Sequence, residues 1–405
     1  MIPTERHIKY FPPKGEIRER VSLLQNQLLQ LEISAAWIEH ITDLFYYTGS
    51  VQDAVFLVPQ SGEPLYLVRK SLSRAVKESP WAAFPFPGRT KLIEEAYHLT
   101  SKYFPKKLGM ALDVTPANNY LRLASHSSNV EIVDISSVLR NQRAIKSLWE
   151  IAQIAAATDQ ATIVFAEMPN FLRSGITELE FSAAVESRLR RLGHGGPLRI
   201  RGMGQELAII MAVSGESASY PTRFDGPVGG EGPYPFVAMG AGQKIIQPGE
   251  TVMTDMVTLY NGYHSDNART FYMGSNIPKE AASAHAFCLD FLQMIVENLK
   301  PGRTCSDVFQ SSDQWAKQHG EPVGFMGYGE NRVKFFGHGV GLELDELPVI
   351  ANKNETELKP GMIIAVEPKV FLPDIGPTGV ENTYVITETG CKSLCSFNMQ
   401  IGIIF

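Results

Sequence analysis

Apolar residues recur at helical spacing near the amino terminus and then gather in short runs. Residues 16–31 carry apolar side chains three or four positions apart, which predicts an amphipathic helix. A further helical stretch covers residues 91–104. Short apolar runs that predict strands lie at 35–38, 54–59, 64–68, 108–112 and 130–132. Alternation of strands and helices is typical of an α/β domain with its own sheet. This half shows no nucleophile, metal-ligand cluster or phosphate loop, which indicates a scaffold or a lid.

A helix-start signal marks the domain boundary. Ser147 is followed three residues later by Glu150, a capping box that opens an apolar-periodic run to Met168. Thr177 and Glu180 form a second predicted capping box, and the helix that it opens is expected to end at Gly193. Because 405 residues are many for one core, we expect two domains, 1–145 and 146–405.

The second half combines irregular and regular segments. Residues 194–249 are dense in glycine and proline, which is typical of loops around a site. Helices are expected from Pro278 to Leu299 and over residues 307–319, and strands over residues 362–367 and 380–387.

A predicted hairpin at residues 251–272 is the centre of the functional interpretation. Two β-branched and aromatic runs flank Asn261-Gly262, the strongest short signal for a type I′ turn. In that register Val257 pairs with Asp266, so Asp255 and Asp266 are diagonal neighbours on one face, roughly 7 Å apart. Two carboxylates at this distance repel unless a cation lies between them, and two divalent ions roughly 3.5–4 Å apart fit the gap. Two exposed aspartates on a polar face remain the alternative.

Composition narrows the class of protein. Hydrophobic residues make up 44%, charged residues 20%, and the net charge is −6, as in ordinary globular proteins. No basic stripe indicates nucleic-acid binding, and no run approaches the roughly 18 apolar residues of a membrane span. The first residues lack an apolar signal segment, and the four cysteines show no zinc-type pairing. A cytoplasmic protein with reduced thiols is expected.

Three more candidate ligands follow the hairpin. Glu367 ends an apolar strand, Glu381 lies in a strand with Thr383 on the same face, and His338 is flanked by glycines. Each alone has an ordinary structural interpretation. With Asp255 and Asp266 they supply four carboxylates and one imidazole, whose charge balances two divalent cations. This oxygen-rich set favours Mn²⁺, with Co²⁺, Fe²⁺ and Zn²⁺ as alternatives.

The order and spacing of these residues resemble a known family. The segments DMVTLYNGYHSDNART, HGVGLELDELP, PGMIIAVEP and GVENT are similar to motifs of the pita-bread metallopeptidases: methionine aminopeptidase, Xaa-Pro aminopeptidase, prolidase and creatinase. TDLFYYTGSVQDAVFLVP resembles the creatinase/prolidase amino-terminal domain. The resemblance implies an α+β protein, with an α/β creatinase-like domain before a carboxyl-terminal pita-bread domain. It also implies a dinuclear site ligated by Asp255, Asp266, His338, Glu367 and Glu381, with Asp266 and Glu381 bridging the ions, and a homodimer.

The sequence departs from the family pattern on the substrate side. Thr222 and Asp345 stand where prolidases and Xaa-Pro aminopeptidases carry histidines, and Gly379 replaces an arginine. These changes put Xaa-Pro specificity in question, because the family residues contact substrate or move protons. Replacement contacts could come from Tyr220, Arg223, His264, which falls on the metal face, or Thr383.

Three functional hypotheses follow. The first is a dinuclear hydrolase that cleaves an amide bond to proline in a short peptide, with water activated by the ions. Glu367 and His338 are its candidate catalytic residues, and Glu367 relays the proton to the leaving nitrogen. The second keeps the metals but takes a non-peptide amide or amidine, or catalyses a lyase reaction. The third, a catalytically dead binding module, conflicts with retention of all five ligands.

Overall fold

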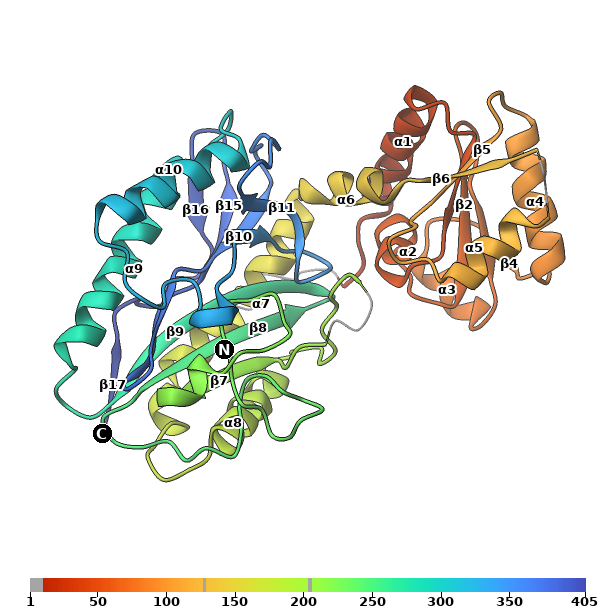
Figure 1. The fold of residues 1–405 in the computed structure, drawn as a ribbon. Helices are drawn as coiled ribbons and strands as arrows, with labels where there is room; N and C mark the ends of the chain where they lie inside the picture. Colours follow the sequence, from red (N-terminus) through yellow and green to blue (C-terminus); the bar gives the residue numbers. More distant parts are fainter. Residues whose placement is uncertain (1–9, 127–128, 203–205) are drawn as a thin grey trace. The chain divides into compact units, whose positions relative to one another are not determined.

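The computed structural model describes residues 10–126, 129–202 and 206–405, and the described chain forms two compact units (Figure 1). One runs up to Arg143 and the other from Ala144 onward. The boundary expected from the sequence, between 145 and 146, lies two residues beyond this division. Most of the amino-terminal segment inspected for a signal peptide, and residues 203–205 of the expected loop region, lie outside the described residues.

The amino-terminal unit is built on a six-stranded mixed sheet with the order β4-β3-β2-β1-β5-β6. Its strands are β1 (Ala35–Ile38), β2 (Ala54–Pro59), β3 (Leu65–Val68), β4 (Ala83–Pro85), β5 (Lys107–Met110) and β6 (Glu131–Asp134). Its helices are α1 (Lys14–Gln30), α2 (Ile41–Thr48), α3 (Leu72–Glu78), α4 (Arg89–Ser101), α5 (Ala117–Ala124) and α6 (Ser136–Ala144). The expected alternation of strands and helices in this half is confirmed.

The carboxyl-terminal unit contains two larger sheets and a two-stranded ribbon. The first sheet has the order β17-β9-β8-β7, the second β11-β10-β12-β15-β16, and β13 pairs with β14. The first sheet is formed by β7 (Ile210–Ser214), β8 (Thr251–Tyr260), β9 (Tyr263–Met273) and β17 (Gly402–Ile404). The second is formed by β10 (Phe335–Gly339), β11 (Glu346–Ala351), β12 (Ile363–Val366), β15 (Asn382–Ile386) and β16 (Cys391–Ser393), and the ribbon by β13 (Lys369–Leu372) and β14 (Gly376–Gly379).

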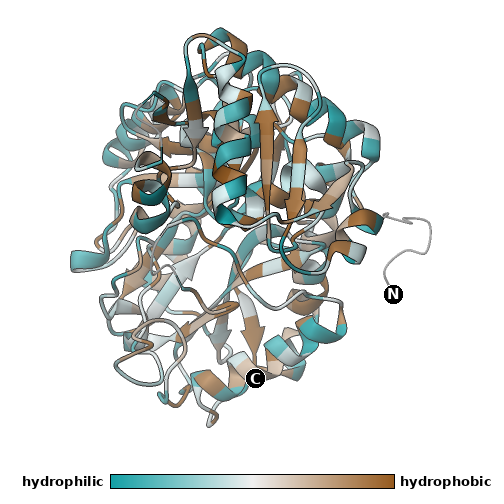
Figure 2. Ribbon diagram, turned by 90° about the vertical axis from the view of Figure 1, so that its right-hand side faces the viewer, coloured by the Kyte–Doolittle hydropathy of each residue, from teal (hydrophilic) through white to brown (hydrophobic). Residues whose placement is uncertain are grey.

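Each larger sheet has its own pair of helices. Helices α7 (Leu148–Ala166) and α8 (Glu178–Arg191) pack on the first sheet, and one apolar core joins them to β7, β8 and β9. Helices α9 (Lys279–Asn298) and α10 (Cys305–Gln318) share a second core with strands of the other sheet. Short 3₁₀ helices lie at Met168–Asn170, Gly215–Ser219 and Gly329–Asn331. In Figure 2 hydrophobic residues concentrate on the strands, while the helices mix hydrophilic and hydrophobic residues.

Local sequence signals explain the helix starts. Ser147 caps α7 and Thr177 caps α8, both with the reciprocal hydrogen bonds of a capping box, as predicted. Gly193, just after α8, has φ +97°, a conformation that favours glycine. The start of α10 differs from the prediction, because Thr304 forms a capping box with Asp307 and the helix begins at Cys305.

The hairpin register agrees with the prediction residue by residue. Tyr260 pairs with Tyr263, and Val257 pairs with Asp266. Asn261 and Gly262 have φ of +50° and +88°, as a type I′ turn requires. Strand β7, which pairs with β8, was not predicted, because its five buried residues lie within a glycine- and proline-rich region. Among the described helices, none has the length and apolar character needed to span a bilayer.

Candidate metal centre

The five predicted ligands line one pocket and come from the β8–β9 hairpin and three later segments of the carboxyl-terminal unit. Asp255 and Asp266 lie on β8 and β9, and His338 lies on β10. Glu367 follows the last residue of β12, and Glu381 precedes β15. All five line one cavity. The hairpin therefore presents both aspartates on the face that the sequence predicted.

Backbone hydrogen bonds join the two sheets beside the ligands. Ala268 of β9 and Glu381 exchange both N–H···O bonds, at 3.2 and 3.1 Å. The Thr383 hydroxyl donates to the Asp266 carbonyl at 2.8 Å, and the Asp266 N–H donates to that hydroxyl at 3.2 Å. These contacts place Asp266 against Glu381 and give fully buried Thr383 a positioning role on the backbone rather than a place in the cavity lining.

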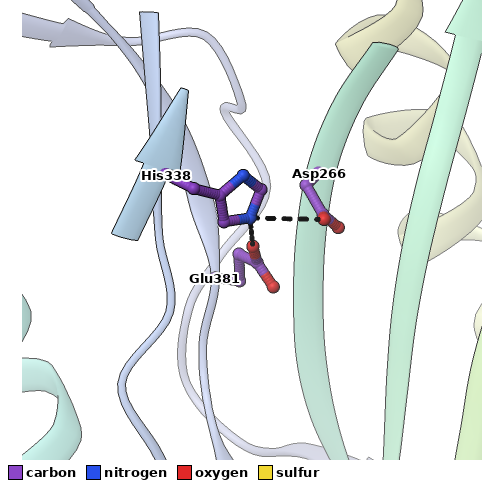
Figure 3. A group of neighbouring side chains, drawn as sticks. All are labelled: Asp266, His338 and Glu381. Atoms are coloured by element: carbon purple, nitrogen blue, oxygen red, sulfur yellow. Dashed lines mark ion pairs between the residues drawn. The ribbon is translucent and has the colours of Figure 1, made fainter. Parts of the chain in front are cut away.

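Asp266, His338 and Glu381 each offer a possible ligand atom, and these atoms lie within 4.8 Å of one another (Figure 3). The His338 Nε2 atom lies 3.9 Å from an oxygen of Asp266, and 3.9 Å from an oxygen of Glu381. It is also 3.9 Å from Glu367 Oε1. Since metal–ligand bonds of about 2.0–2.2 Å allow two ligands of one ion to lie up to about 4 Å apart, the spacing suits a shared ion.

Buried oxygens in the cluster lack partners. Asp266 Oδ1 and Glu381 Oε1 accept no hydrogen bond from the described residues, although their side chains are nearly inaccessible to solvent. An unsatisfied buried carboxylate oxygen is costly. The donor set of Asp266, His338, Glu367 and Glu381 therefore fits a divalent cation, and oxygen-rich ligation with one imidazole suits Mn²⁺.

The electrostatics of the cluster reflect crowding of like charges. Burial, followed by Glu381 and Asp255, raises the pKa of Asp266 well above its usual value. Burial also raises the pKa of Glu381 to about 8, although the neighbouring Lys369 opposes this shift. For His338, burial lowers the pKa, but Asp345, Glu367 and Glu381 outweigh it and leave the pKa raised.

Lys369 is a cluster residue that the sequence interpretation missed. Its Nζ donates to Asp255 Oδ2 at 2.8 Å, to Glu367 Oε2 at 2.8 Å and to Glu381 Oε2 at 2.7 Å. Burial alone would lower its pKa, but these carboxylates outweigh burial and raise the pKa of Lys369 well above its usual value. A lysine inside the otherwise apolar run KVFL was the available signal, because lysine is rarely buried without acidic partners.

The substrate-side candidates are placed differently from one another. Asp345 lines the cavity, and its Oδ1 lies 3.2 Å from His338 Nδ1, so it can orient the imidazole. Thr222, Arg223 and Tyr220 are not among the residues that line the cavity. The Thr222 backbone N–H donates to Asn331 at 2.8 Å, while its buried hydroxyl has no partner among the described residues.

His264 lies on the predicted face but does not reach the cavity. It is fully buried, with Nδ1 3.0 Å from the Gly341 carbonyl oxygen, and its Nε2 accepts from the Arg199 backbone N–H at 3.2 Å. Loop residues therefore enclose the ring, and they are distant in sequence from the hairpin. Both ring nitrogens of this neutral imidazole take part in hydrogen bonds to the backbone, so His264 stabilises the fold and does not contact a substrate.

His264 should make stability depend on pH. Burial lowers its pKa from 6.5 to about 4, so the unfolded chain binds the proton first as the pH falls. The stabilisation is complete above pH 6.5 and is lost as the pH falls to about 4, by about 3 kcal/mol. In urea titrations with EDTA, His264→Gln should show a correspondingly smaller loss over this range. The exposed His98→Gln is the control, and an unchanged pH dependence in His264→Gln would contradict the assignment.

Other residues of the cavity were not foreseen. Its apolar wall includes Leu207, Met211, Phe224, Val228, Phe335 and Leu344. Its acidic residues are Asp225, Asp255, Asp266, Asp345, Glu367 and Glu381, and the described lining includes neither lysine nor arginine. Four of these apolar residues lie in loops without a regular sequence period, and Met211 and Phe335 lie on β7 and β10, two strands that the sequence pattern did not predict.

Comparisons with known proteins agree across nearly the whole chain. Residues 152–388 match the metallopeptidase family M24, and residues 20–145 match the creatinase/prolidase amino-terminal domain. An Xaa-Pro dipeptidase of Pyrococcus furiosus is 27% identical over 388 residues, covering 95% of this chain and all of the relative.

Solved structures show the same similarity. Prolidase from Pyrococcus furiosus has a TM-score of 0.74 at 25% identity, covering 92% of this chain and 99% of that one. Dipeptidase PepE from Mycobacterium ulcerans has a TM-score of 0.80 at 23% identity, covering 97% of this chain and 99% of that one, and supports the fold alone. The expected architecture, a creatinase-like domain followed by a pita-bread domain, is confirmed.

Proposed function

Because the chain belongs to metallopeptidase family M24, and is a hydrolase of that class, we propose that it cleaves the amide bond before a proline with the help of a divalent metal ion. The observation that carries this proposal is the convergence of Asp255, Asp266, His338, Glu367 and Glu381 on one cavity. The match to Xaa-Pro dipeptidases over the full length of those relatives supports the substrate class.

Different residues of the chain would bind the metal ion and transfer the proton. Asp266, His338, Glu367 and Glu381 would hold the ion, with Mn²⁺ favoured and Co²⁺, Fe²⁺ or Zn²⁺ as alternatives. When bound, the ion supplies Lewis-acid chemistry to the substrate carbonyl and to water. Glu367 takes the proton from water and passes it to the leaving nitrogen.

The remaining parts of the cavity position the substrate. Asp345 faces His338 Nδ1 and would hold the ring with Nε2 directed at the cluster. The apolar wall, which includes Phe224 and Phe335, suits a proline ring. The second ion expected from the sequence remains a prediction, and the position between Asp255 and Glu381 contains the Lys369 ammonium.

The charge of the cavity predicts a preference among prolyl substrates. Six carboxylates line the described cavity, and the Lys369 ammonium together with a divalent ion would offset three of their charges. The remaining negative charge would repel a free carboxylate beside the scissile bond. We expect kcat/KM for Ala-Pro-amide to exceed that for Ala-Pro by about tenfold or more, since 1.4 kcal/mol of repulsion suffices for this ratio.

The measurement compares the two substrates at equal Mn²⁺ concentration, with release of alanine as the readout. Asp345→Asn supplies a matched variant, because it removes one charge from the cavity rim while retaining the side-chain size. Asp345→Asn should reduce the ratio of kcat/KM for Ala-Pro-amide to kcat/KM for Ala-Pro. A clear preference for the free acid would contradict the electrostatic interpretation.

A second candidate is a small cationic amide or amidine, which the same excess of carboxylates favours. A substrate panel with Mn²⁺-loaded protein distinguishes the two. It should contain Xaa-Pro dipeptides, Xaa-Pro-containing longer peptides, prolyl amides and small amides or amidines. If the protein hydrolyses only the small amides or amidines, this result would favour the second candidate function.

The homodimeric state and cytoplasmic location expected from the sequence belong to the same proposal. Light scattering coupled to gel filtration tests the first, and cell fractionation tests the second.

A further inference from the structure

A buried ammonium stands inside the carboxylate cluster. The Lys369 side chain is 1% exposed, and its Nζ lies 2.7–2.8 Å from oxygens of Asp255, Glu367 and Glu381. Three carboxylates around one lysine nitrogen use all three of its donors. The ammonium is therefore a fully coordinated cation at the point where Asp255 meets the other ligands.

The two glutamates divide their oxygens between two positions. Glu367 and Glu381 each direct Oε2 to Lys369 Nζ, while their Oε1 atoms lie 3.9 Å from His338 Nε2. Asp266 faces the His338 side, and its Oδ1, like Glu381 Oε1, is buried without a partner. One position in the cluster is thus filled by a cation of the chain, and the other has unsatisfied ligands.

We propose that this site holds a single divalent ion and that the Lys369 ammonium permanently replaces a second one. The ion is ligated by Asp266, His338, Glu367 and Glu381, whereas Asp255 is bound to Lys369. The proposal deepens the proposed function and rests on it for the presence of a divalent ion. Its content is the number of ions and the role of Lys369.

The geometry opposes displacement of the lysine by a second ion. Lys369 lies on β13, directly paired with Gly379 of β14, where an added Cβ would lie 2.7 Å from Lys369 Cα. Only a glycine at 379 therefore allows the two backbones to approach this closely at Lys369. A second ion would need oxygens of Asp255 and Glu381 that Lys369 already occupies, and it would lie within a few ångströms of the positive nitrogen.

This arrangement also relates two positions of the chain. The sequence lacks an arginine at 379, and the structure places a lysine on the paired residue of the neighbouring strand. The positive charge of Lys369 offsets one negative charge of the carboxylate cluster, and its side chain is not part of the cavity lining. It therefore cannot clamp a substrate carboxylate.

Metal counting tests the proposal. Wild-type protein, Lys369→Met and Lys369→Arg are stripped with EDTA, loaded with excess Mn²⁺ and freed of unbound metal by gel filtration. We expect one Mn²⁺ per chain for wild type and Lys369→Arg, and two for Lys369→Met, by mass spectrometry. The exposed Lys359→Met is the matched control and should bind one.

Electron paramagnetic resonance provides a readout independent of turnover. Two Mn²⁺ ions roughly 3.5–4 Å apart couple magnetically, so only Lys369→Met should give a coupled spectrum. Two coupled ions in wild type, or no metal bound to wild type, would overturn the proposal, and so would a single ion in folded Lys369→Met. If Lys369→Met does not fold, the number of Mn²⁺ ions per chain in the wild type and in Lys369→Arg still distinguishes one bound ion from two. One ion in a wild type that cleaves no prolyl substrate would support this proposal while refuting the proposed function.

Discussion

Glu367→Gln should lower kcat for a prolyl amide substrate by about 10²- to 10⁴-fold, the range typical of lost acid–base catalysis. Glutamine has nearly the same shape but cannot accept the proton from water at neutral pH. In the structure Glu367 lines the cavity and is hydrogen-bonded by Lys369 at 2.8 Å, so its side chain is already held in place.

Loss of metal must be separated from loss of proton transfer. Activity is therefore measured across a Mn²⁺ titration to saturation, with the metal content determined at each point. The exposed Glu355→Gln serves as the control and should retain wild-type kcat. If Glu367→Gln keeps its kcat at saturating Mn²⁺, another group must carry the proton.

Lys369→Met should destabilise the metal-free protein by about 3–5 kcal/mol, because removing one partner of a buried charge cluster leaves the others uncompensated. Four carboxylates, those of Asp255, Asp266, Glu367 and Glu381, would then share the site without the ammonium. For a unit of this size the loss corresponds to a decrease in Tm on the order of 10 °C.

Thermal denaturation in EDTA measures this effect, and addition of Mn²⁺ should reverse most of it by mass action. The expected rescue is larger for Lys369→Met than for wild type, since the variant has two positions to fill. Lys359→Met should melt as the wild type does. Equal Tm values for Lys369→Met and wild type in EDTA would show that the carboxylates protonate without cost.

The local pattern was sufficient to predict the strand segments around four of the five candidate ligands, but not β10, which carries His338. Asn261-Gly262 determines a two-residue turn, and this turn alone places Asp255 and Asp266 on one face of β8 and β9. Capping boxes at Ser147 and Thr177 determine where α7 and α8 begin. These features depend on neighbours in the chain, so the sequence contains the whole physical cause.

The contents of the site beyond the ligands were decided only by tertiary structure. Lys369 enters the cluster because β13 pairs with β14 and brings it against Asp255, which lies 114 residues away along the chain. His264 looked like a substrate contact from its face on the hairpin, but loops carrying Arg199 and Gly341 enclose it. Such contacts join segments without periodic patterns. The proposed number of bound ions therefore depends on packing between distant strands. The four residues proposed to ligate the ion can all be identified in the sequence, but the pairing of Asp255 with Lys369 cannot.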